Sequence, residues 1–306
     1  MKTFFRLVCL LACSAPAFVS ASESPEAVRP SVPAGLEKAV RLSDGKVGFF
    51  VLDLDSGASA GWGDEGMYPM MSVFKFPLAL SVLSRVDEGK LDMDAKYRVA
   101  GKDLDPKTWS PMREKFPQGG MFTLRELLRY SVAESDNNAC DFLFGLIGGP
   151  AAAQADLKKW GVEDISIRVL EGVMQDDWNA IYLNAARPSA MAGLLKLFAD
   201  GKILREATNR ELWEMMAGCK TGTDRLVQGM PAGAVLAHKT GSSGVRKDGL
   251  VGAFNDVGIA VLPDGRRLAI CAFVSDSRRP VKECAAVIAS LARWACSEWR
   301  APEKKE

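Results

Sequence analysis

Apolar residues at both ends of the chain follow patterns typical of β-strands. The segment 47–57, VGFFVLDLDSG, is rich in β-forming residues and runs into a glycine and serine turn. Near the other end, DVGIAVL and RLAICAFV flank Pro263-Asp264-Gly265, which predicts an antiparallel hairpin. The segment 280–299 begins with a proline and repeats apolar residues at helical spacing, so we expect a helix that packs on this sheet.

Between residues 69 and 217 the apolar spacing is helical instead. In TLRELLRYSV, Thr123 and Glu126 have the spacing of a capping box at a helix start. We therefore expect an α/β chain of the α+β type, in which residues 22–68 and 218–306 form an antiparallel sheet flanked by helices. Residues 69–217 would form an all-helical domain, and the cleft between the two domains would be the place for a ligand.

The first residues are typical of an export signal. Lys2 and Arg6 precede the apolar run LVCLLAC, and FVSA supplies small residues at a cleavage point near Ala21. A proline then breaks the run, which argues against a buried helix. We interpret residues 1–21 as a signal peptide, so the mature protein is expected in the periplasm or outside the cell. A lipoprotein attached through Cys13 is the alternative.

Composition excludes several classes of partner. The 306 residues are 48% hydrophobic and 25% charged, as in ordinary globular proteins. Basic and acidic residues number 39 and 38, so no strong field attracts nucleic acid or an anionic membrane. A small ligand, neutral or locally anionic, remains the expected partner.

The cysteines and the single histidine do not suggest a metal centre. Two of the seven cysteines lie in the predicted signal, which leaves an odd number and therefore at least one free thiol. No C-x-x-C motif occurs, and with His238 alone a zinc site has too few ligands. We expect buried thiols with at most one or two disulfides. The remaining cysteines are Cys140, Cys219, Cys271, Cys284 and Cys296.

The tetrad Ser-x-x-Lys, which can supply an activated serine, occurs at Ser43–Lys46 and at Ser72–Lys75. The first has turn composition and precedes a strand. The second opens the apolar run SVFKFPLALSVLSRV, where residues three apart share a helix face and the helix dipole favours a developing alkoxide. Ser72 is thus the better nucleophile candidate. Pro77 should kink this helix or shift its start.

Two further polar positions stand out. Ser135-Asp136-Asn137 lies between two predicted helices, the second from about residue 138 to 147. Its side chains could face a cleft, although a plain helix cap by Asp136 or Asn137 is the simpler reading. Glu171 lies in the polar, irregular segment RVLEGVMQDDWN, where a solvated loop residue is the simpler reading.

Lys-Thr-Gly occurs twice, at residues 220–222 and 239–241. The first copy follows RELWEMMAGC, whose apolar residues repeat at helical spacing, so Lys220 and Gly222 are expected at a helix C-terminus. The second follows the apolar AVLAH and leads into SSG, as expected of a strand that lines a cleft. We interpret the second copy as the functional one.

The order Ser-x-x-Lys, Ser-Asp-Asn, Glu and Lys-Thr-Gly resembles the class A serine β-lactamases over nearly the whole mature chain. Within that class the chain is similar to the PER/VEB-type extended-spectrum branch. The similar stretches are SVFKF, KTWSP, YSVAESDNNACDFLFGLIGGPAA, PAGAVLAHKTGSSG and FNDVGIAVLPDGR. The resemblance implies the fold shared by serine β-lactamases and penicillin-binding proteins, and hydrolysis of β-lactam antibiotics through a serine acyl-enzyme, with antibiotic resistance as the outcome.

The resemblance also implies residue roles. Ser72 would attack the lactam carbonyl, with Lys75 and Ser135 moving protons and Glu171 activating the water that hydrolyses the acyl-enzyme. It leaves open whether Glu171 or Lys75 is the acylation base. Backbone N–H groups of Ser72 and Ser242 would form the oxyanion hole. The substrate-binding residues would be Asn137, Lys239, Thr240, Gly241, Ser242, Ser243, Arg225, Trp109 and Gln175.

Departures from the wider class qualify the expected activity. Gln175 replaces an Asn that helps position the water, and Val169 and Asn184 replace the Arg and Asp of a salt bridge across the loop. A differently folded, roomier loop would follow, in keeping with bulky oxyimino-cephalosporins as substrates. Met71 and Ser243 occupy the places of a cysteine pair found in carbapenemases, so carbapenem hydrolysis is not expected as a main activity.

Trp109 would stack on substrate at the site entrance, although an ordinary half-buried tryptophan is the alternative. His238 is expected to be structural. The resemblance implies a monomer with β-lactam substrates and mechanism-based inhibitors as ligands, and neither a cofactor, a metal, nucleic acid nor an obligate protein partner. Two other functions share most of the motifs: a penicillin-binding D,D-peptidase, and a β-lactam sensor domain that stays acylated. Glu171 and the absence of a membrane-spanning pattern favour the β-lactamase over both.

Overall fold

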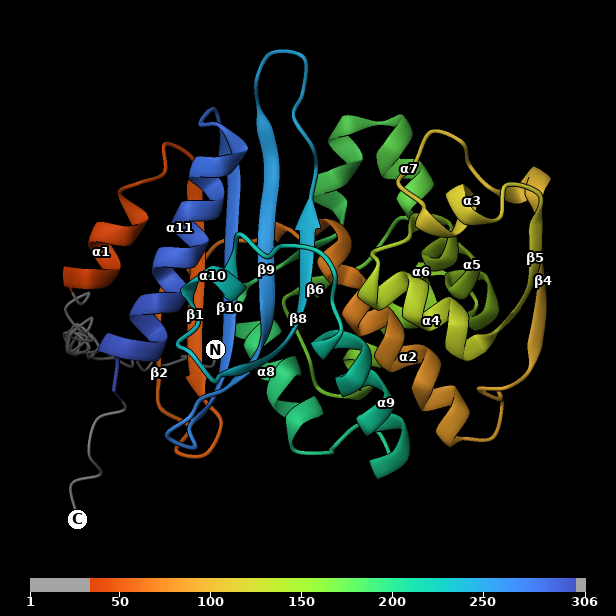
Figure 1. The fold of residues 1–306 in the computed structure, drawn as a ribbon, viewed down its shortest axis with the longest axis horizontal. Helices are drawn as coiled ribbons and strands as arrows, with labels where there is room; N and C mark the ends of the chain where they lie inside the picture. The colour runs from red at the N-terminus through yellow and green to blue at the C-terminus, as the bar shows by residue number, and fades with distance from the viewer. Residues whose placement is uncertain (1–33, 301–306) are drawn as a thin grey trace, which may run out of the picture. The chain divides into compact units, whose positions relative to one another are not determined.

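The computed structural model describes residues 34–300, which contain a five-stranded antiparallel sheet with strand order β2-β1-β10-β9-β8. Because the first two strands pair with the last three, the two ends of the sequence form one sheet (Figure 1). The predicted signal peptide lies outside the described residues. The strands of this sheet are β1 Lys46–Asp53, β2 Ser59–Trp62, β8 Val235–Ser242, β9 Val251–Val261 and β10 Arg267–Ser277.

The predicted C-terminal hairpin is confirmed. Strands β9 and β10 pair antiparallel from Val261 opposite Arg267 to Val251 opposite Ser277. At the turn, the N–H of Gly265 donates to the carbonyl of Leu262, and Gly265 has a φ of 89°, a conformation that glycine adopts without a Cβ clash. The β-rich segment 47–57 likewise forms β1, which pairs with β10 along its whole length.

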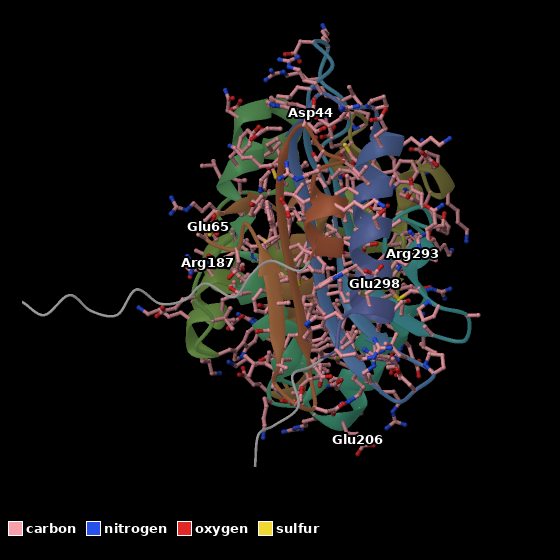
Figure 2. The ribbon with its side chains drawn as sticks, turned by 90° about the vertical axis from the view of Figure 1, so that its left-hand side faces the viewer. Asp44, Glu65, Arg187, Glu206, Arg293 and Glu298 are labelled. Carbon is pink, nitrogen blue, oxygen red and sulfur yellow. The ribbon has the colours of Figure 1, made fainter. Side chains whose placement is uncertain are left out.

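Helices cover both faces of the sheet, and β10 shows why the sheet accepts them. Successive strand residues point to opposite faces. Thus Leu268 and Ile270 join the core beneath α1 Ala34–Val40 and α11 Val281–Arg293, while Cys271 and Phe273 join the core of the other helices. Figure 2 shows Arg293, the last residue of α11, and Glu298, in the helical turn after it, on the opposite side of the sheet from Arg187. A sheet buried on both faces explains the near-continuous apolar runs of β9 and β10.

The predicted C-terminal helix is also confirmed. Pro280 is the N-cap of α11, and Cys284, Val287, Ile288 and Leu291 are buried against the sheet. A π-helical turn, Trp294–Glu298, follows. The short helix α10, Leu226–Gly229, packs against α11 on the same side.

The segment of residues 68–217 is mainly helical. Its helices are α2 Lys75–Asp87, α3 Pro111–Lys115, α4 Leu124–Ala133, α5 Asn137–Ile147, α6 Pro150–Lys159, α7 Glu171–Asp176, α8 Pro188–Ala199 and α9 Glu206–Ala217, with 3-10 helices Met71–Phe74, Gly101–Asp103 and Trp178–Leu183. It also contains short β segments that the helical spacing did not predict, because pieces of two to five residues are too short for visible alternation. They are β3 Tyr68–Pro69, β4 Lys96–Ala100, β5 Gly119–Thr123, β6 Ile165–Ser166 and β7 Ala185–Ala186.

Two local expectations for these helices are confirmed. Thr123 caps α4 as a full capping box, since its hydroxyl accepts from the Glu126 N–H and the Glu126 carboxylate accepts from the Thr123 N–H. Pro77 shifts a helix start: α2 begins at Lys75, so the proline falls in the first turn, where its missing N–H costs no helical hydrogen bond. The residues Lys75 to Leu83 are all buried, which makes α2 the central helix of this part.

The five cysteines outside the predicted signal are all free thiols. The expectation of at least one free thiol is confirmed, and the described residues contain no disulfide. None of the helices within residues 34–300 is both long enough and apolar enough to span a membrane.

Candidate active site

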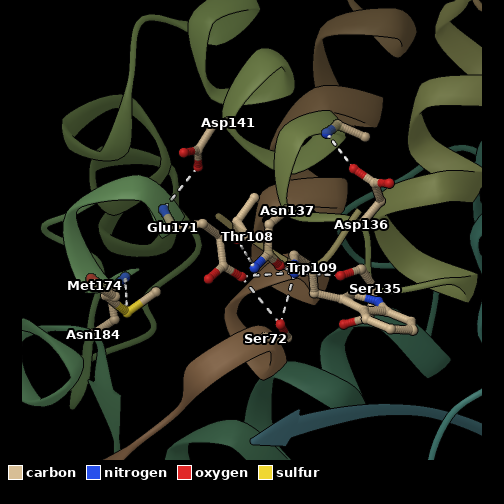
Figure 3. A network of polar contacts seen from close by, with 12 residues as sticks. Ser72, Thr108, Trp109, Ser135, Asp136, Asn137, Asp141, Glu171, Met174 and Asn184 are labelled. Carbon is tan, nitrogen blue, oxygen red and sulfur yellow. Dashed lines mark hydrogen bonds and ion pairs between the residues drawn. The ribbon is translucent and has the colours of Figure 1, made fainter. Parts of the chain in front are cut away.

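Ser72 lies in the 3-10 helix that joins β3 to α2, and its hydroxyl group has two partners. Its Oγ accepts a hydrogen bond from Lys75 Nζ at 2.7 Å and donates to Glu171 Oε1 at 3.1 Å (Figure 3). The residue before it, Met71, has a φ of 46°, a region that non-glycine residues rarely adopt. Such strain is typical of sites where the surrounding structure fixes one side chain in place.

Lys75 is the electrostatic centre of the site. Its side chain is fully buried, and four oxygens surround Nζ: Ser72 Oγ at 2.7 Å, the Ser135 carbonyl at 2.9 Å, Asn137 Oδ1 at 2.5 Å and Glu171 Oε1 at 2.7 Å. An ammonium has three protons to donate, so these four acceptors share them. The other Ser-x-x-Lys lies elsewhere, because Lys46 is exposed and pairs with Asp276.

In the Ser-Asp-Asn motif, Asp136 caps a helix, while Ser135 and Asn137 line the cavity. Asp136 is the N-cap of α5 and accepts from the Ala139 N–H at 2.8 Å, so the capping interpretation holds for this residue alone. Ser135 has a φ of 59° and its Oγ accepts from Lys239 Nζ at 2.9 Å. Asn137 contacts Lys75 and donates to Thr108 Oγ1 at 2.6 Å.

Glu171 is buried and helical, so the prediction of an irregular loop here was wrong, and the alternative of a solvated residue does not hold either. It is the first residue of α7, and only 3% of its surface is exposed. The carboxylate of Asp141, on α5, accepts hydrogen bonds from the Glu171 and Gly172 N–H groups at 2.8 and 2.9 Å. Burial raises the pKa of Asp141 to about 6, although these two N–H donors oppose the shift. Asp141 thus fixes the backbone of Glu171 from behind.

Asn184 closes the segment that begins at Glu171. Its Oδ1 accepts from the N–H groups of Arg168 and Val169 at 2.7 and 3.1 Å, and its Nδ2 donates to the Val169 carbonyl at 2.8 Å. These neutral hydrogen bonds join the places where the wider class often has an ionic pair. Gln175 lies on α7 between Glu171 and Asn184, is exposed, and lines the site cavity.

Strand β8 forms the opposite wall and carries the second Lys-Thr-Gly. Lys239 is fully buried and donates to Ser135 Oγ and to the Thr240 carbonyl, at 2.9 and 3.0 Å. Burial lowers the pKa of Lys239 to about 8. At Gly241 an added Cβ would overlap the Met70 carbonyl oxygen and lie 3.3 Å from the Ser72 nitrogen. Glycine therefore lets the strand approach the turn that carries Ser72.

Arg225 lies behind the same strand. Its guanidinium stacks 3.6 Å over the Phe254 ring and donates to the carbonyls of Gly241 and Asn255 at 2.9 and 2.7 Å. Both carbonyls belong to strands β8 and β9, so the guanidinium is held in one position beside Lys-Thr-Gly. Arg225 also lines the site cavity.

The first Lys-Thr-Gly is not the end of a helix, and that expectation was wrong. Helix α9 ends at Ala217 with Gly218 as its cap, so Lys220 and Gly222 lie beyond it. Thr221 Oγ1 instead lies 2.5 Å from Thr240 Oγ1, and an added Cβ at Gly222 would overlap the Thr240 side chain. The first copy therefore packs against the second and places Thr221 in the cavity wall.

Asn255 was missed by the sequence analysis. It is fully buried on β9 and donates from Nδ2 to the carbonyls of Pro69 and Met70, at 2.8 and 3.0 Å. These carbonyls precede the strained Met71, so Asn255 supports the turn that carries Ser72. A signal was present, since Asn255-Asp256 interrupts an otherwise apolar strand.

His238 has a structural partner. Its Nδ1 lies 2.8 Å from the buried Asp256 carboxylate. Burial opposes the charged imidazole, but Asp256 outweighs burial and raises the pKa of His238 to about 10. For Cys219, burial likewise opposes the thiolate, while a hydrogen bond with His238 lowers the pKa of the thiol to about 7.

The site opens into a cavity of about 690 Å³. Trp109 lies at its edge, 57% exposed, and its Nε1 donates to the Glu134 carbonyl at 3.1 Å. Lys75 and Lys239 lie buried directly behind the lining. The predicted residues that line this cavity are Ser72, Trp109, Ser135, Asn137, Glu171, Gln175, Arg225, Thr240, Gly241, Ser242 and Ser243.

A serine held between a buried lysine and a carboxylate, beside backbone N–H groups and basic residues that can receive anionic oxygens, defines an acyl-transferring serine hydrolase. The sequence pattern of the β-lactamase enzyme family matches residues 34–299. The chain is 41% identical over 230 residues to the extended-spectrum β-lactamase PER-1 of Pseudomonas aeruginosa, covering 74% of each protein. It is 36% identical over 260 residues to β-lactamase VEB-1 of the same organism, covering 84% of this chain and 87% of that protein.

Solved structures agree with these relatives. A β-lactamase from Chitinophaga pinensis matches with a TM-score of 0.83 at 43% identity, covering 84% of this chain and 95% of that chain. The extended-spectrum β-lactamase TLA-1 matches with a TM-score of 0.83 at 38% identity, covering 86% and 96%. The chain belongs to the β-lactamase enzyme family; it is a class A serine enzyme that hydrolyses β-lactam antibiotics. The resemblance drawn from its motifs is confirmed, and each relative reported above is named a β-lactamase, not a peptidase or a sensor.

The buried ammonium of Lys239 predicts a falling alkaline limb in the pH profile of kcat/KM. Since burial lowers its pKa to about 8, Lys239 loses its charge as pH rises through that value, and attraction for an anionic substrate group is lost. Lys239→Arg stays charged and should move the limb upward by at least one pH unit. Steady-state kinetics between pH 6 and pH 10 would test this, and an identical limb in both proteins would contradict it.

Asn255→Ala should lower kcat more than it changes KM. The substitution removes two hydrogen bonds behind the Ser72 turn but touches no part of the cavity, so about a tenfold loss in kcat with KM within about twofold is expected. Ser290→Ala, on α11 away from the cavity, is the control. Equal changes in kcat and KM would show that Asn255 does not act through the nucleophile.

Proposed function

We propose that Ser72 is the nucleophile and that hydrolysis proceeds through an ester on its Oγ. The observation that carries this proposal is the contact of one hydroxyl with both Lys75 Nζ and Glu171 Oε1, at 2.7 and 3.1 Å. Glu171 Oε1 accepts the hydroxyl hydrogen bond and can take its proton as Oγ attacks the lactam carbonyl. Lys75 can take that proton only as the neutral amine, because an ammonium has no free electron pair. Negative charge then develops on the carbonyl oxygen, and the backbone N–H groups of Ser72 and Ser242 are the proposed donors.

Collapse of this intermediate breaks the lactam C–N bond, and the nitrogen must receive a proton. We assign this delivery to Ser135, whose hydroxyl lies 2.9 Å from Lys239 Nζ and whose carbonyl accepts from Lys75. Lys239, Thr240 and Arg225 are proposed to bind the substrate carboxylate, because two cations and a hydroxyl converge beside the Lys-Thr-Gly strand. Asn137 has an amide that can hold the amide of the acyl side chain.

Deacylation requires a base and a water on the other side of the ester. Glu171 is the proposed base, since its buried carboxylate is held by backbone contacts to Asp141 and aimed at Ser72. Water attack on the ester carbonyl returns the proton to Ser72 Oγ and releases the hydrolysed product. Gln175, one turn further along α7, can both donate and accept toward that water.

Glu171→Gln should trap the acyl-enzyme. The amide keeps the side-chain shape but cannot take a proton from water, so a chromogenic cephalosporin should give a burst of about one product per enzyme and then nearly stop. Mass spectrometry should show the added acyl mass on Ser72. Glu163→Gln, an exposed carboxamide substitution near β6, should behave like the parent. Undiminished turnover by Glu171→Gln would remove Glu171 from the mechanism.

We also propose an extended spectrum that includes oxyimino-cephalosporins. The relatives PER-1 and TLA-1 are named as extended-spectrum enzymes, and they are 41% and 38% identical to this chain over the aligned residues. The cavity of about 690 Å³ offers room for a large acyl side chain. The segment that contains Glu171 is held by neutral hydrogen bonds of Asn184, where the wider class often has an ionic pair.

Kinetics on the parent enzyme test this spectrum directly. We expect kcat/KM for ceftazidime to fall within about a hundredfold of that for cephalothin, and imipenem to be much poorer. A ceftazidime value more than about ten-thousandfold below cephalothin would restrict the enzyme to substrates with small side chains.

Export to the periplasm and a monomeric state complete the proposal. The basic residues, apolar run and small residues of positions 1–21 support export with cleavage near Ala21. The monomer is implied by the family resemblance, and every step proposed above uses residues of a single chain.

A further inference from the structure

Gly252, near the start of β9, lies against the 3-10 helix Trp178–Leu183 with no space for a side chain. A Cβ at this position would lie 2.6 Å from Ile181 Cδ1 and 2.7 Å from Trp178 Cζ2, closer than real Cβ contacts occur. The backbone of Gly252 is not in the left-handed region, so its conformation does not require glycine. Space for the two apolar side chains is the physical reason for glycine here.

The same two side chains line the active-site cavity. Trp178 is also covered by Arg246, whose guanidinium lies 5.5 Å from the ring centroid, and Tyr182 of the same 3-10 helix donates to Asp276 at 2.5 Å. The Glu171–Asn184 segment is tied down at one end by Asp141 and at the other by the Asn184 carbonyl, which accepts from the Met70 N–H at 2.8 Å. Gly252 contacts the part of the segment that lies between these two hydrogen-bonded ends, at Trp178 and Ile181.

Trp178 and Ile181 together form one wall of the cavity, which we call the Trp178–Ile181 wall. Gly252 also joins this wall to the end of the Lys-Thr-Gly strand. An added Cβ would lie 3.4 Å from Ser243 Oγ, and that hydroxyl accepts from the Ala253 N–H at 3.0 Å. In Figure 1, α7 lies beside the end of β8, and residues of both line the cavity. Strands rise about 3.3 Å per residue, so Ser243 lies roughly 10 Å from Thr240 along the wall. The Trp178–Ile181 wall therefore meets β8 well away from the proposed carboxylate site at Thr240.

We propose that Gly252 is a specificity-determining residue that seats the Trp178–Ile181 wall, and that this wall packs against the bulky heteroaryl oxyimino side chain of a cephalosporin. The inference rests on the proposed extended spectrum and deepens it. With the carboxylate held near Thr240 and the side-chain amide near Asn137, a long acyl group extends toward the far end of β8. There it meets an indole and an isoleucine, which offer apolar and stacking contacts. A small acyl group does not reach them.

The test compares Gly252→Ala with Gly193→Ala on ceftazidime and cephalothin. In Gly252→Ala the new methyl group displaces Trp178 and Ile181. The ratio of kcat/KM for ceftazidime to kcat/KM for cephalothin should therefore fall about five- to tenfold, mainly through a higher KM for ceftazidime. Gly193, in α8, has no atom within 4 Å of an added Cβ, and its variant should keep the parent ratio. Ile181→Val removes the clashing Cδ1, so Gly252→Ala/Ile181→Val should recover most of the ratio relative to Ile181→Val alone.

A folded Gly252→Ala with an unchanged ratio, or with equal losses on both substrates, would overturn the proposal. If Gly252→Ala does not fold by circular dichroism, Trp178→Ala decides in its place: a selective rise in KM for ceftazidime supports the wall, and an unchanged ratio overturns it. Parent activity on ceftazidime is measured in the same assay. If the parent does not hydrolyse ceftazidime, the extended spectrum itself is refuted. If the parent hydrolyses ceftazidime and the variants keep the parent ratio, only the role of Gly252 is refuted.

Discussion

The burial of one ammonium group determines how the rest of the site is built. A charge removed from water is stable only if oxygens replace its hydration shell, and an unpaired one would cost several kcal/mol. Lys75 is the first residue of α2, and most of its oxygens come from other elements: the start of α5 with the residue Ser135 before it, and the first residue of α7. Ser72 supplies the remaining oxygen from the preceding turn. Satisfying one charge thus brings three distant segments to the same point.

Positions next to this charge carry the backbone strain of the site. Met71 and Ser135 both have positive φ, and each is adjacent to, or is itself, a proposed catalytic residue. Such conformations persist only when neighbouring groups hold them. The amide of Asn255 on the nucleophile side and Lys239 on the Ser135 side are the groups in contact there. Strand β9, though it lies one strand away from the cavity wall, therefore takes part in shaping it.

Much of the fold could be predicted from sequence because its signals are local. The Pro-Asp-Gly hairpin, the capping box at Thr123 and the proline-led final helix each depend on neighbouring residues. The motif residues of the site could be named for a different reason, since their chemistry and order match a known family. What could not be predicted depends on contacts between segments distant in sequence. Glu171 reads as a loop residue because its partners, Lys75 and Asp141, lie on other helices that are distant in sequence.

The two copies of Lys-Thr-Gly show the same limit. The apolar residues before Lys220 continue a helical spacing, but α9 ends at Ala217, and Thr221 beyond it packs against Thr240 instead. Only the tertiary contact between Thr221 and Thr240 distinguishes a cavity wall from a helix end. Asn255 was visible as a polar residue in an apolar strand, yet its partners, two carbonyls almost two hundred residues away, were not.

The free thiols have a consequence for how the chain matures. Cys140, Cys271, Cys284 and Cys296 are buried, so the native fold itself shields them from oxidants and from one another. In the export proposed above, the unfolded chain exposes the same thiols to oxidising surroundings, where they can cross-link wrongly. Folding must therefore bury these sulfurs faster than oxidation joins them, so the yield of active enzyme depends on the rate of folding relative to the rate of thiol oxidation.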